Sequence, residues 1–254
     1  MKKIVFDIGM HKGEDTLVYL NSGFHVIAVE ANPLLVDLAT KKFKSHIEEG
    51  RLKILNFGIN IKSNENILFY KNVNKSEWSS FDYEAAFKND SKIENIFVNT
   101  ITMEDLLIKY GIPFYLKIDI ESYDTLCLES LFNFKKLPEY ISCEASSIKN
   151  IELLNTLGYS KFKLINQSWF HKPINMNMEK NIFFPYFNLV INIFRKRLAY
   201  IFNFKYPVGS SGPFAENSKG NWLSYDQVKN LFLEFYSNEI GINKQSWFDI
   251  HAKL

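Results

Sequence analysis

This sequence of 254 residues contains few cysteines and few glycines, and its net charge is close to zero. Two cysteines are too few for a disulfide scaffold, and 11 glycines exclude a collagen repeat. Because 30 Lys and Arg residues balance 28 Asp and Glu residues, the formal net charge is only +2 and creates no long-range field for nucleic acid. We therefore expect a globular protein with no nucleic-acid partner.

Long hydrophobic runs are also missing. The first apolar run ends at Asp7 after three residues, so we expect no signal peptide. Residues 182–194 are apolar but include Pro185, and the run is too short and too polar to span a bilayer. We expect a cytoplasmic protein without a transmembrane segment, in which Cys127 and Cys143 are reduced and buried.

Short apolar segments alternate with segments of helical spacing along the first two thirds of the chain. This alternation predicts an α/β fold with a doubly wound, mostly parallel sheet. The expected strands are 3–9, 25–31, 52–59, 96–101, 115–121 and 139–145, and the expected helices are 14–22, 33–45, 102–110, 123–132, 147–157 and 223–238. Residues 66–71 would be a hairpin partner of 52–59, and residues 160–166 and 168–173 would form an antiparallel edge.

Two segments do not fit this alternation. Residues 72–92 are polar and rich in turn residues, and a loop of that length is usually functional or disordered. Residues 181–204 are amphipathic and aromatic, so they would cover an acceptor pocket, contact a second subunit in a homodimer, or touch a membrane surface peripherally. We divide the chain into a catalytic domain, 1–175, and a C-terminal extension, 176–254.

A first candidate site follows the first strand, where the sequence reads DIGMHKG over residues 7–13, and Glu30 ends the second strand. Glycines let the backbone approach a ligand closely, and an acid at the second strand tip suits ribose hydroxyls. The G-x-G-x-x-G pattern of dinucleotide sites is missing, and Asp7 would repel a diphosphate but attract an ammonium or sulfonium group. S-adenosylmethionine therefore fits better than NAD, and the alternative is a purely structural turn.

A second candidate site lies in LKIDIE, residues 116–121. Strand alternation puts Lys117, Asp119 and Glu121 on one face, and Glu144 ends the next expected strand. Such carboxylates position a hydroxyl, act as a general base, or bind a hard divalent cation. A salt-bridge network among these charges is the structural alternative.

These segments, taken together, resemble the FkbM-family S-adenosylmethionine-dependent methyltransferases. The resemblance rests on FDIGMHKGEDT, GFHVIAVEANP, NTITMEDLL, LKIDIE and YISCEAS, in that order, over about residues 3–146. It implies a class I Rossmann-like O-methyltransferase, with Glu30 on the ribose and with Asp119 and Glu121 facing the methyl-transfer centre. The residues that we assign to cofactor binding are Asp7, Gly9, Gly13, Thr16, Glu30, Ala31, Asn32 and Asp119.

The sequence departs from the family pattern at two places. Ser122 stands where the family usually has a glycine after the DIE motif, which puts the backbone turn in question. The glycine loop carries Met10, His11 and Lys12 where the family usually has small or neutral residues, so His11 is a candidate for a role of its own.

The function expected from the resemblance is methyl transfer to a hydroxyl of a sugar, a nucleotide-sugar or a surface-polysaccharide precursor. Segments SSGPFAE and SWFDIHA are similar to ones in members that act on bacterial surface sugars. Candidate catalytic residues are Asp119 and Glu121, with His171 and His11 as alternatives, because an imidazole titrates near neutral pH. We expect no metal; the alternative is a divalent metal held by Asp119, Glu121 and Glu144. An NAD(P)-dependent oxidoreductase and a non-catalytic cofactor-binding member are the competing interpretations.

Overall fold

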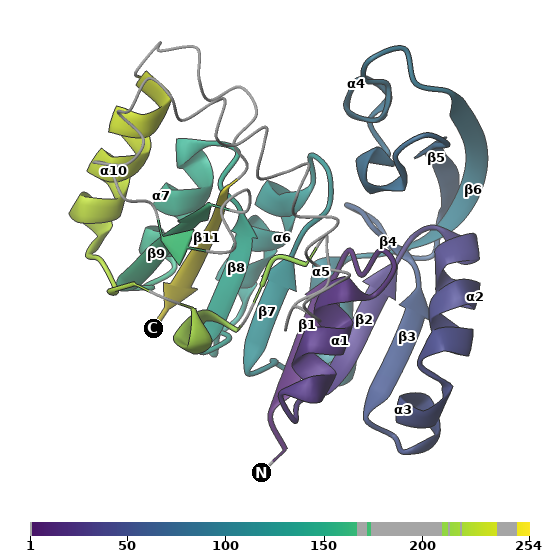
Figure 1. Cartoon of the computed structure of the whole chain (residues 1–254), viewed down its shortest axis with the longest axis horizontal. Helices are drawn as coiled ribbons and strands as arrows, with labels where there is room; N and C mark the ends of the chain where they lie inside the picture. The colour runs from purple at the N-terminus through teal and green to yellow at the C-terminus, as the bar shows by residue number, and fades with distance from the viewer. Residues whose placement is uncertain (1, 167–171, 174–209, 213, 219, 238–247) are drawn as a thin grey trace, which may run out of the picture. The chain divides into compact units, whose positions relative to one another are not determined.

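The computed structural model describes residues 2–166, 172–173, 210–212, 214–218, 220–237 and 248–254 (Figure 1). His171 and the amphipathic segment 181–204 lie outside the described residues. The chain divides into two compact units, Met1–Ile141 and Ser142–Leu254.

A parallel sheet forms the centre of the first unit. Its strands are β1 (Ile4–Ile8), β2 (His25–Glu30), β3 (Leu52–Asn56) and β7 (Tyr115–Ile118), in the order β7-β1-β2-β3. All of β7, and all of β1 after its first residue, are buried, as is typical of parallel strands that are covered on both faces. The carboxyl ends of these strands therefore meet at one edge.

Helices follow the strands near the predicted places, except that the expected helix 33–45 is divided at Phe43 into two helices. They are α1 (Glu14–Asn21), α2 (Pro33–Lys42), α3 (Lys44–Glu48), α5 (Met103–Tyr110) and α6 (Asp124–Ser130), the last followed by the 3-10 turn η2 (Leu131–Asn133). The Asn32 side chain accepts a hydrogen bond from Leu34 N, and Thr102 accepts one from Asp105 N, so both residues are N-caps. These caps start α2 and α5 directly after the strand that precedes each.

A small three-stranded sheet interrupts the alternation and corrects one expectation. Its strands are β4 (Gly58–Ile59), β5 (Asn66–Asn72) and β6 (Ile93–Ile101), in the order β4-β6-β5. The predicted hairpin between 52–59 and 66–71 was wrong, because β5 pairs antiparallel with β6. The apolar run 52–59 is divided instead: β3 joins the large sheet, whereas β4 pairs with β6.

The long segment between β5 and β6 is ordered. It contains the 3-10 turn η1 (Ser76–Trp78) and the short helix α4 (Tyr83–Ala86). Two backbone hydrogen bonds, Tyr70 N to Ser80 O at 2.9 Å and Ser80 N to Tyr70 O at 3.1 Å, fold the segment back onto β5. The small sheet and this segment are seen above the ends of β2 and β3 in Figure 1.

The second unit carries the antiparallel edge. Most of β8 (Tyr140–Glu144) belongs to it, with β11 (Phe248–Lys253), β9 (Lys161–Asn166) and β10 (Lys172–Pro173). Strand β9 pairs antiparallel with both β11 and β10. Helices α7 (Ile148–Thr156) and α10 (Tyr225–Ser237) and the 3-10 turn η4 (Ala215–Asn217) complete the described part. Strand β11 was not expected, because the polar residues Asp249 and His251, which are buried in the strand, conceal its apolar character.

The fold class predicted from the sequence is confirmed. The described strands form a mostly parallel α/β sheet of the Rossmann-like type with an antiparallel edge. Both cysteines are buried. No helix within the described ranges has the length and apolar character needed to cross a membrane.

Candidate active site

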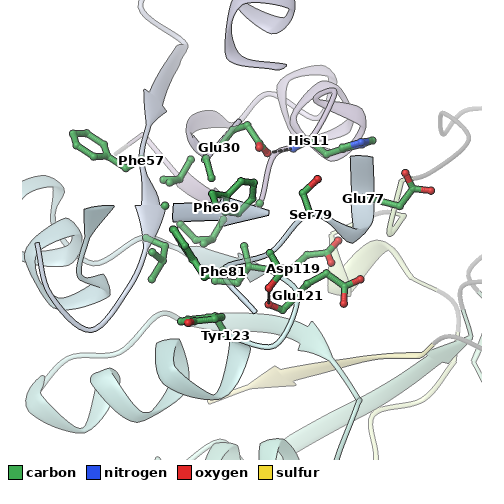
Figure 2. Close-up of a pocket in the computed structure, with 18 of the residues that line it drawn as sticks. His11, Glu30, Phe57, Phe69, Glu77, Ser79, Phe81, Asp119, Glu121 and Tyr123 are labelled. Atoms are coloured by element: carbon green, nitrogen blue, oxygen red, sulfur yellow. Dashed lines mark hydrogen bonds between the residues drawn. The ribbon is translucent and has the colours of Figure 1, made fainter. Parts of the chain in front are cut away.

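An open cavity lies within the first unit, at the carboxyl ends of β1, β2 and β7. Its empty space, which includes open solvent at the mouth, measures about 610 Å³. The other walls come from residues 57–59, from Phe69 of β5 and from residues 76, 77 and 79–81. Figure 2 shows Glu30, Asp119 and Glu121 around this space, together with the rings of Phe69, Phe81 and Tyr123. This is the edge at which ligands bind in doubly wound sheets.

Gly9 lets the loop after β1 lie against the end of β7. Its φ is +85°, and a Cβ at this position would lie only 1.9 Å from the Asp119 carbonyl oxygen. The Gly9 and Met10 N–H groups both donate to Val29 O at 3.0 Å, which fixes the loop on β2 as well. A residue other than glycine at position 9 would push β1 and β7 apart.

Two backbone amides hold the carboxylate of Glu30. His11 N donates to Oε2 at 2.8 Å, and Asn32 N donates to Oε1 at 2.9 Å. Burial raises the pKa of Glu30 above its ordinary value, although both hydrogen bonds oppose this. Each oxygen keeps a second lone pair for a further donor, and the side chain lines the cavity (Figure 2).

A buried lysine lies behind the cavity among three carboxylates. Lys117 Nζ is 3.3 Å from Asp7 Oδ1, 3.3 Å from Asp15 Oδ2 and 3.2 Å from Asp119 Oδ2. Burial favours its neutral amine, but the charges of Asp119, Asp7 and Asp15 outweigh burial and hold the pKa of Lys117 well above its ordinary value. Lys117 therefore takes part in a salt-bridge network, which was the structural alternative to a ligand site at this strand. Asp119 belongs both to this network and to the cavity lining.

Asp7 belongs to this network and not to the cavity lining. Its side chain is fully buried, and Thr16 Oγ1 donates to Asp7 Oδ2 at 2.6 Å. Burial raises the pKa of Asp7 to about 6, against the opposing charge of Lys117. Thr16, Gly13 and Asn32 are likewise absent from the described lining, whereas Gly9, Glu30, Ala31 and Asp119 are present in it.

Asp119 and Glu121 both line the cavity and lie side by side in Figure 2. The Asp119 side chain is 38% exposed, whereas Glu121 accepts from Lys88 Nζ at 3.0 Å and its carbonyl accepts from Ser80 Oγ at 3.1 Å. Burial raises the pKa of Glu121, although the hydrogen bond and charge of Lys88 lower it. One carboxylate is thus exposed to the cavity, and the other is a stronger base than an ordinary glutamate.

Of the other residues predicted to be catalytic or metal-binding, His11 lines the cavity, and Glu144 is absent from the described lining. Glu144 belongs to the second unit, and His171 lies outside the described residues. Among the residues that the structure describes, no group of three or more His, Cys, Asp or Glu side chains is arranged to hold a metal ion.

The sequence did not identify the contribution of the 72–92 segment residue by residue. Ser76, Glu77, Ser79, Ser80 and Phe81 line the cavity. The Phe81 ring lies between two others, with centroids 5.1 Å from that of Phe69 and 5.7 Å from that of Tyr123. The only signal in the sequence is its unusual length for a loop inside a compact domain.

His11 has an unusual backbone conformation, with φ at +54°. The left-handed region costs a residue with a Cβ about 1–2 kcal/mol. Its ring nitrogen Nε2 lies 2.7 Å from Ser76 Oγ, and Nδ1 lies 3.5 Å from Glu14 Oε2. Burial would raise the pKa of Glu14, but its hydrogen bond and charge interaction with His11 leave that pKa lowered. The ring therefore joins two elements at the cavity rim.

Ser122 also has a left-handed backbone, with φ at +71°. The turn is closed by hydrogen bonds from Tyr123 N to Ile120 O at 3.1 Å and from Ile120 N to Asp124 Oδ1 at 3.0 Å. The serine thus takes the conformation that glycine adopts most readily, and the turn after Glu121 is kept despite the departure from the family pattern.

Charge distinguishes the ligands that suit this cavity. Four carboxylates contribute to its described lining, Glu30, Glu77, Asp119 and Glu121, and no lysine or arginine does so among the described residues. Such a lining attracts a cationic ligand and repels a diphosphate. The cavity therefore fits a nucleoside cofactor with a sulfonium and an ammonium group better than a dinucleotide.

A close-approach glycine and strand-end carboxylates on a Rossmann-like sheet define a class of nucleoside-binding enzymes to which methyltransferases belong. The chain belongs to the FkbM methyltransferase family: the family model described as "Methyltransferase FkbM domain" matches residues 7–188. The resemblance seen in the sequence is thereby confirmed. No curated protein matches the sequence.

Several solved structures of methyltransferases are similar to the chain at low sequence identity. The C-terminal domain of precorrin-6Y C5,15-methyltransferase from Rhodobacter capsulatus has 13% identity and a TM-score of 0.38, over 65% of this chain and 66% of that one. The METTL16 MTase domain has 13% identity and a TM-score of 0.40, over 65% and 54%. Precorrin-6y C5,15-methyltransferase from Geobacter metallireducens GS-15 has 10% identity and a TM-score of 0.38, over 99% and 78%. The match thus spans slightly less than two thirds of the first of these proteins and about half of the second.

Proposed function

We propose that the protein is an S-adenosylmethionine-dependent O-methyltransferase that acts on a hydroxyl of a small polar acceptor, with a sugar as the preferred class. The observation that carries the proposal is the set of four carboxylates around the cavity, with no described lysine or arginine in the lining. Membership of a methyltransferase family supports the same conclusion. When bound, the cofactor supplies an electrophilic methyl group on a sulfonium.

Glu30 is the residue that we assign to the ribose of the cofactor. Its two oxygens already accept from His11 N and Asn32 N, so the carboxylate is oriented before a ligand arrives. Gly9 keeps the backbone close to the ligand, and Asp119 contributes negative charge. Asn32 holds Glu30 through its backbone N–H, and Ala31 lines the cavity beside Glu30. Thr16 donates to Asp7 behind the cavity, and Gly13 N donates to Met10 O within the glycine loop.

Proton removal is assigned to Glu121, and Asp119 orients the acceptor hydroxyl. A displacement requires the acceptor oxygen to approach the methyl carbon in line at roughly 3–3.5 Å, with no covalent enzyme intermediate. The raised pKa of Glu121 suits it to accept a proton, and Lys88 holds its carboxylate in place. The His11 ring is occupied by Ser76 and Glu14, which favours the carboxylates over His11 as the base.

An uncharged acceptor suits the described lining best. A diphosphate would meet the carboxylates without a lining lysine or arginine, which disfavours nucleotide-sugars relative to neutral sugars. The rings of Phe81, Phe69 and Tyr123 offer apolar faces of the kind that pack on sugar rings. We propose a cytoplasmic enzyme acting on surface-polysaccharide precursors, and residues 181–204 as the part that covers the acceptor or contacts a partner.

Parallel thermal-shift titrations with S-adenosylmethionine, S-adenosylhomocysteine and NAD test the cofactor. A ligand at one hundred times its Kd stabilises the folded state by about 2.7 kcal/mol, so both methionine-derived ligands should raise the melting temperature clearly. Stabilisation by NAD alone would favour the oxidoreductase, and stabilisation by none of the three would favour a non-catalytic role. Loss of activity with EDTA would return Asp119, Glu121 and Glu144 to consideration as metal ligands.

Replacement of Asp119 tests the reaction itself. Asp119→Asn keeps the shape of the side chain but removes a charge that faces the cavity, and we expect turnover to fall by about 10²- to 10⁴-fold. Binding of S-adenosylhomocysteine, measured by calorimetry, should remain nearly intact, because this ligand has no sulfonium charge to pair with Asp119 and because Glu30 is untouched. Unchanged turnover would remove Asp119 from the mechanism.

A further inference from the structure

The glycine loop is joined to the segment that covers the cavity. Residues 73–81, the cover segment, contribute four side chains with polar or charged groups and the Phe81 ring to the described lining. His11 Nε2 and Ser76 Oγ lie 2.7 Å apart, although the two residues are separated by 65 positions in the sequence. This contact holds the first half of the cover segment against the loop that follows β1.

The same histidine contacts the carboxylate assigned to the ribose. His11 N donates to Glu30 Oε2 at 2.8 Å, so one residue touches Glu30 through its backbone and the cover segment through its ring (Figure 2). A displacement of His11 would disturb both contacts. The cover segment and Glu30 are therefore mechanically linked through a single residue.

The backbone of His11 argues that the ring has a role. A glycine would adopt a φ of +54° without strain, whereas a histidine is strained there. Strain of this kind persists where surrounding contacts enforce it and often marks a functional site. The contacts here are those of the ring with Ser76 and with Glu14.

The other end of the cover segment is held independently. Ser80 Oγ donates to Glu121 O, and Ser80 pairs with Tyr70 of β5 through two backbone hydrogen bonds. Neither contact involves His11. The part around Ser76 is also tied to the end of β5, because Asn72 Oδ1 accepts from Asn74 N at 3.0 Å and from Lys75 N at 2.8 Å. Loss of the His11 contact would therefore free the side of this part that faces the glycine loop, while the part around Ser80 stays in place.

We propose that His11 is a positioning residue that holds the cover segment closed over the cavity and couples its closure to Glu30. A ribose on Glu30 and a closed segment then stabilise each other. The coupling to a ribose rests on the proposed function, but the closure does not.

Hydrogen exchange followed by mass spectrometry on the full chain tests the closure. We expect His11→Gly, which relieves the backbone strain but removes the ring, and Ser76→Ala each to raise exchange in residues 73–81 about two- to tenfold in the absence of ligand. The double variant should exchange no faster than the faster single variant, because both changes remove one contact. Ser63→Ala is the matched control: its hydroxyl joins Ser63 to Thr102 away from the cavity, so exchange in 73–81 should match the wild type.

Addition of S-adenosylhomocysteine tests the coupling. In the wild type it should slow exchange in 73–81, and in both variants it should bind about two- to tenfold more weakly. Wild-type exchange in ligand-free His11→Gly and Ser76→Ala, or a double variant equal to the product of the two single effects, would overturn the proposal. If S-adenosylhomocysteine does not bind the wild type, the cofactor assignment and the coupling fail together, while faster ligand-free exchange in the variants would still support the closure.

Discussion

At position 122, a serine occupies a backbone conformation that glycine enters without strain. The left-handed conformation destabilises a folded state with serine by about 1–2 kcal/mol. Replacement by glycine removes this strain, but the greater conformational freedom of glycine in the unfolded chain lowers stability by about 0.4–1 kcal/mol. Ser122 is exposed with φ at +71°, so little packing is lost on replacement. Ser122→Gly should therefore raise the free energy of unfolding by about 0.5–1 kcal/mol in urea titrations. Ser122→Ala keeps the Cβ and should show no gain; an equal gain there would contradict the strain.

Glu121 gives the reaction a pH dependence with a defined sign. Burial raises the pKa of Glu121, and the base must be deprotonated, so kcat/KM should fall as pH decreases through that raised pKa. Glu121→Gln should have low turnover and lack this acidic limb. The limb is measured from kcat/KM against pH, which reports the free enzyme.

Lys88 provides the matched variant for this assignment. Its hydrogen bond and charge lower the pKa of Glu121, so Lys88→Met should move the acidic limb to higher pH. A limb that stays in place in Lys88→Met would assign it to another group, with the exposed carboxylate of Asp119 as the first candidate.

At the scale of the element, strand β7 brings one buried cation into contact with three carboxylates. Lys117→Met leaves Asp7, Asp15 and Asp119 without that cation, and breaking a buried pair typically costs about 3–5 kcal/mol. We expect a loss of that size in urea unfolding. A second variant that adds Asp7→Asn to Lys117→Met keeps the test informative if Lys117→Met alone fails to fold. It removes one buried charge and should recover part of the loss; no recovery would contradict the electrostatic origin.

Elements whose apolar pattern is uninterrupted were predicted well, and elements that depend on distant partners were not. Strands β1, β2 and β7 and the caps Asn32 and Thr102 follow from local sequence. The pairing of β5 with β6 joins residues that are between 21 and 33 positions apart, and β11 includes buried polar residues. Neither the pairing of β5 with β6 nor the strand character of β11 can be predicted from a local sequence pattern.

The candidate site divides in the same way. Glycine spacing and strand-end acids identified Gly9, Glu30, Asp119 and Glu121, all of which line the cavity. The burial of Asp7 under Lys117 was not predictable, because it depends on strand order: β1 and β7 are neighbours, and Asp7 lies directly opposite Lys117. A sequence shows that acids are present but not which of them a buried lysine neutralises.

For the whole molecule, buried acids set the trend of stability with pH. Asp7 has a folded-state pKa raised from 3.8 to about 6. Between these values the folded state binds more protons than the unfolded state, so this group lowers stability as pH rises from about 4 to 6, and its effect is constant above that range. Glu30 and Glu121, whose pKa values are also raised, act with the same sign.

Comparison of wild type with Asp7→Asn isolates this effect. The amide does not titrate, so the variant should gain stability relative to the wild type between pH 4 and 6, by about 3 kcal/mol, and the difference should then stay level. Urea unfolding at half-unit pH steps measures the difference. A difference independent of pH would place the Asp7 pKa at its ordinary value.

The residues that line the cavity are close together in the sequence, which makes it practical to change the acceptor specificity of the enzyme. Every residue of the described lining falls in one of a few short stretches between Ile8 and Tyr123. A library made from four synthetic cassettes, for residues 8–11, 57–59, 76–81 and 119–123, would vary most of that surface while leaving the second unit at its native sequence. Because the backbone at Gly9 admits no side chain, and because Asp119 and Glu121 are assigned to the reaction, these three codons should stay fixed in such a library.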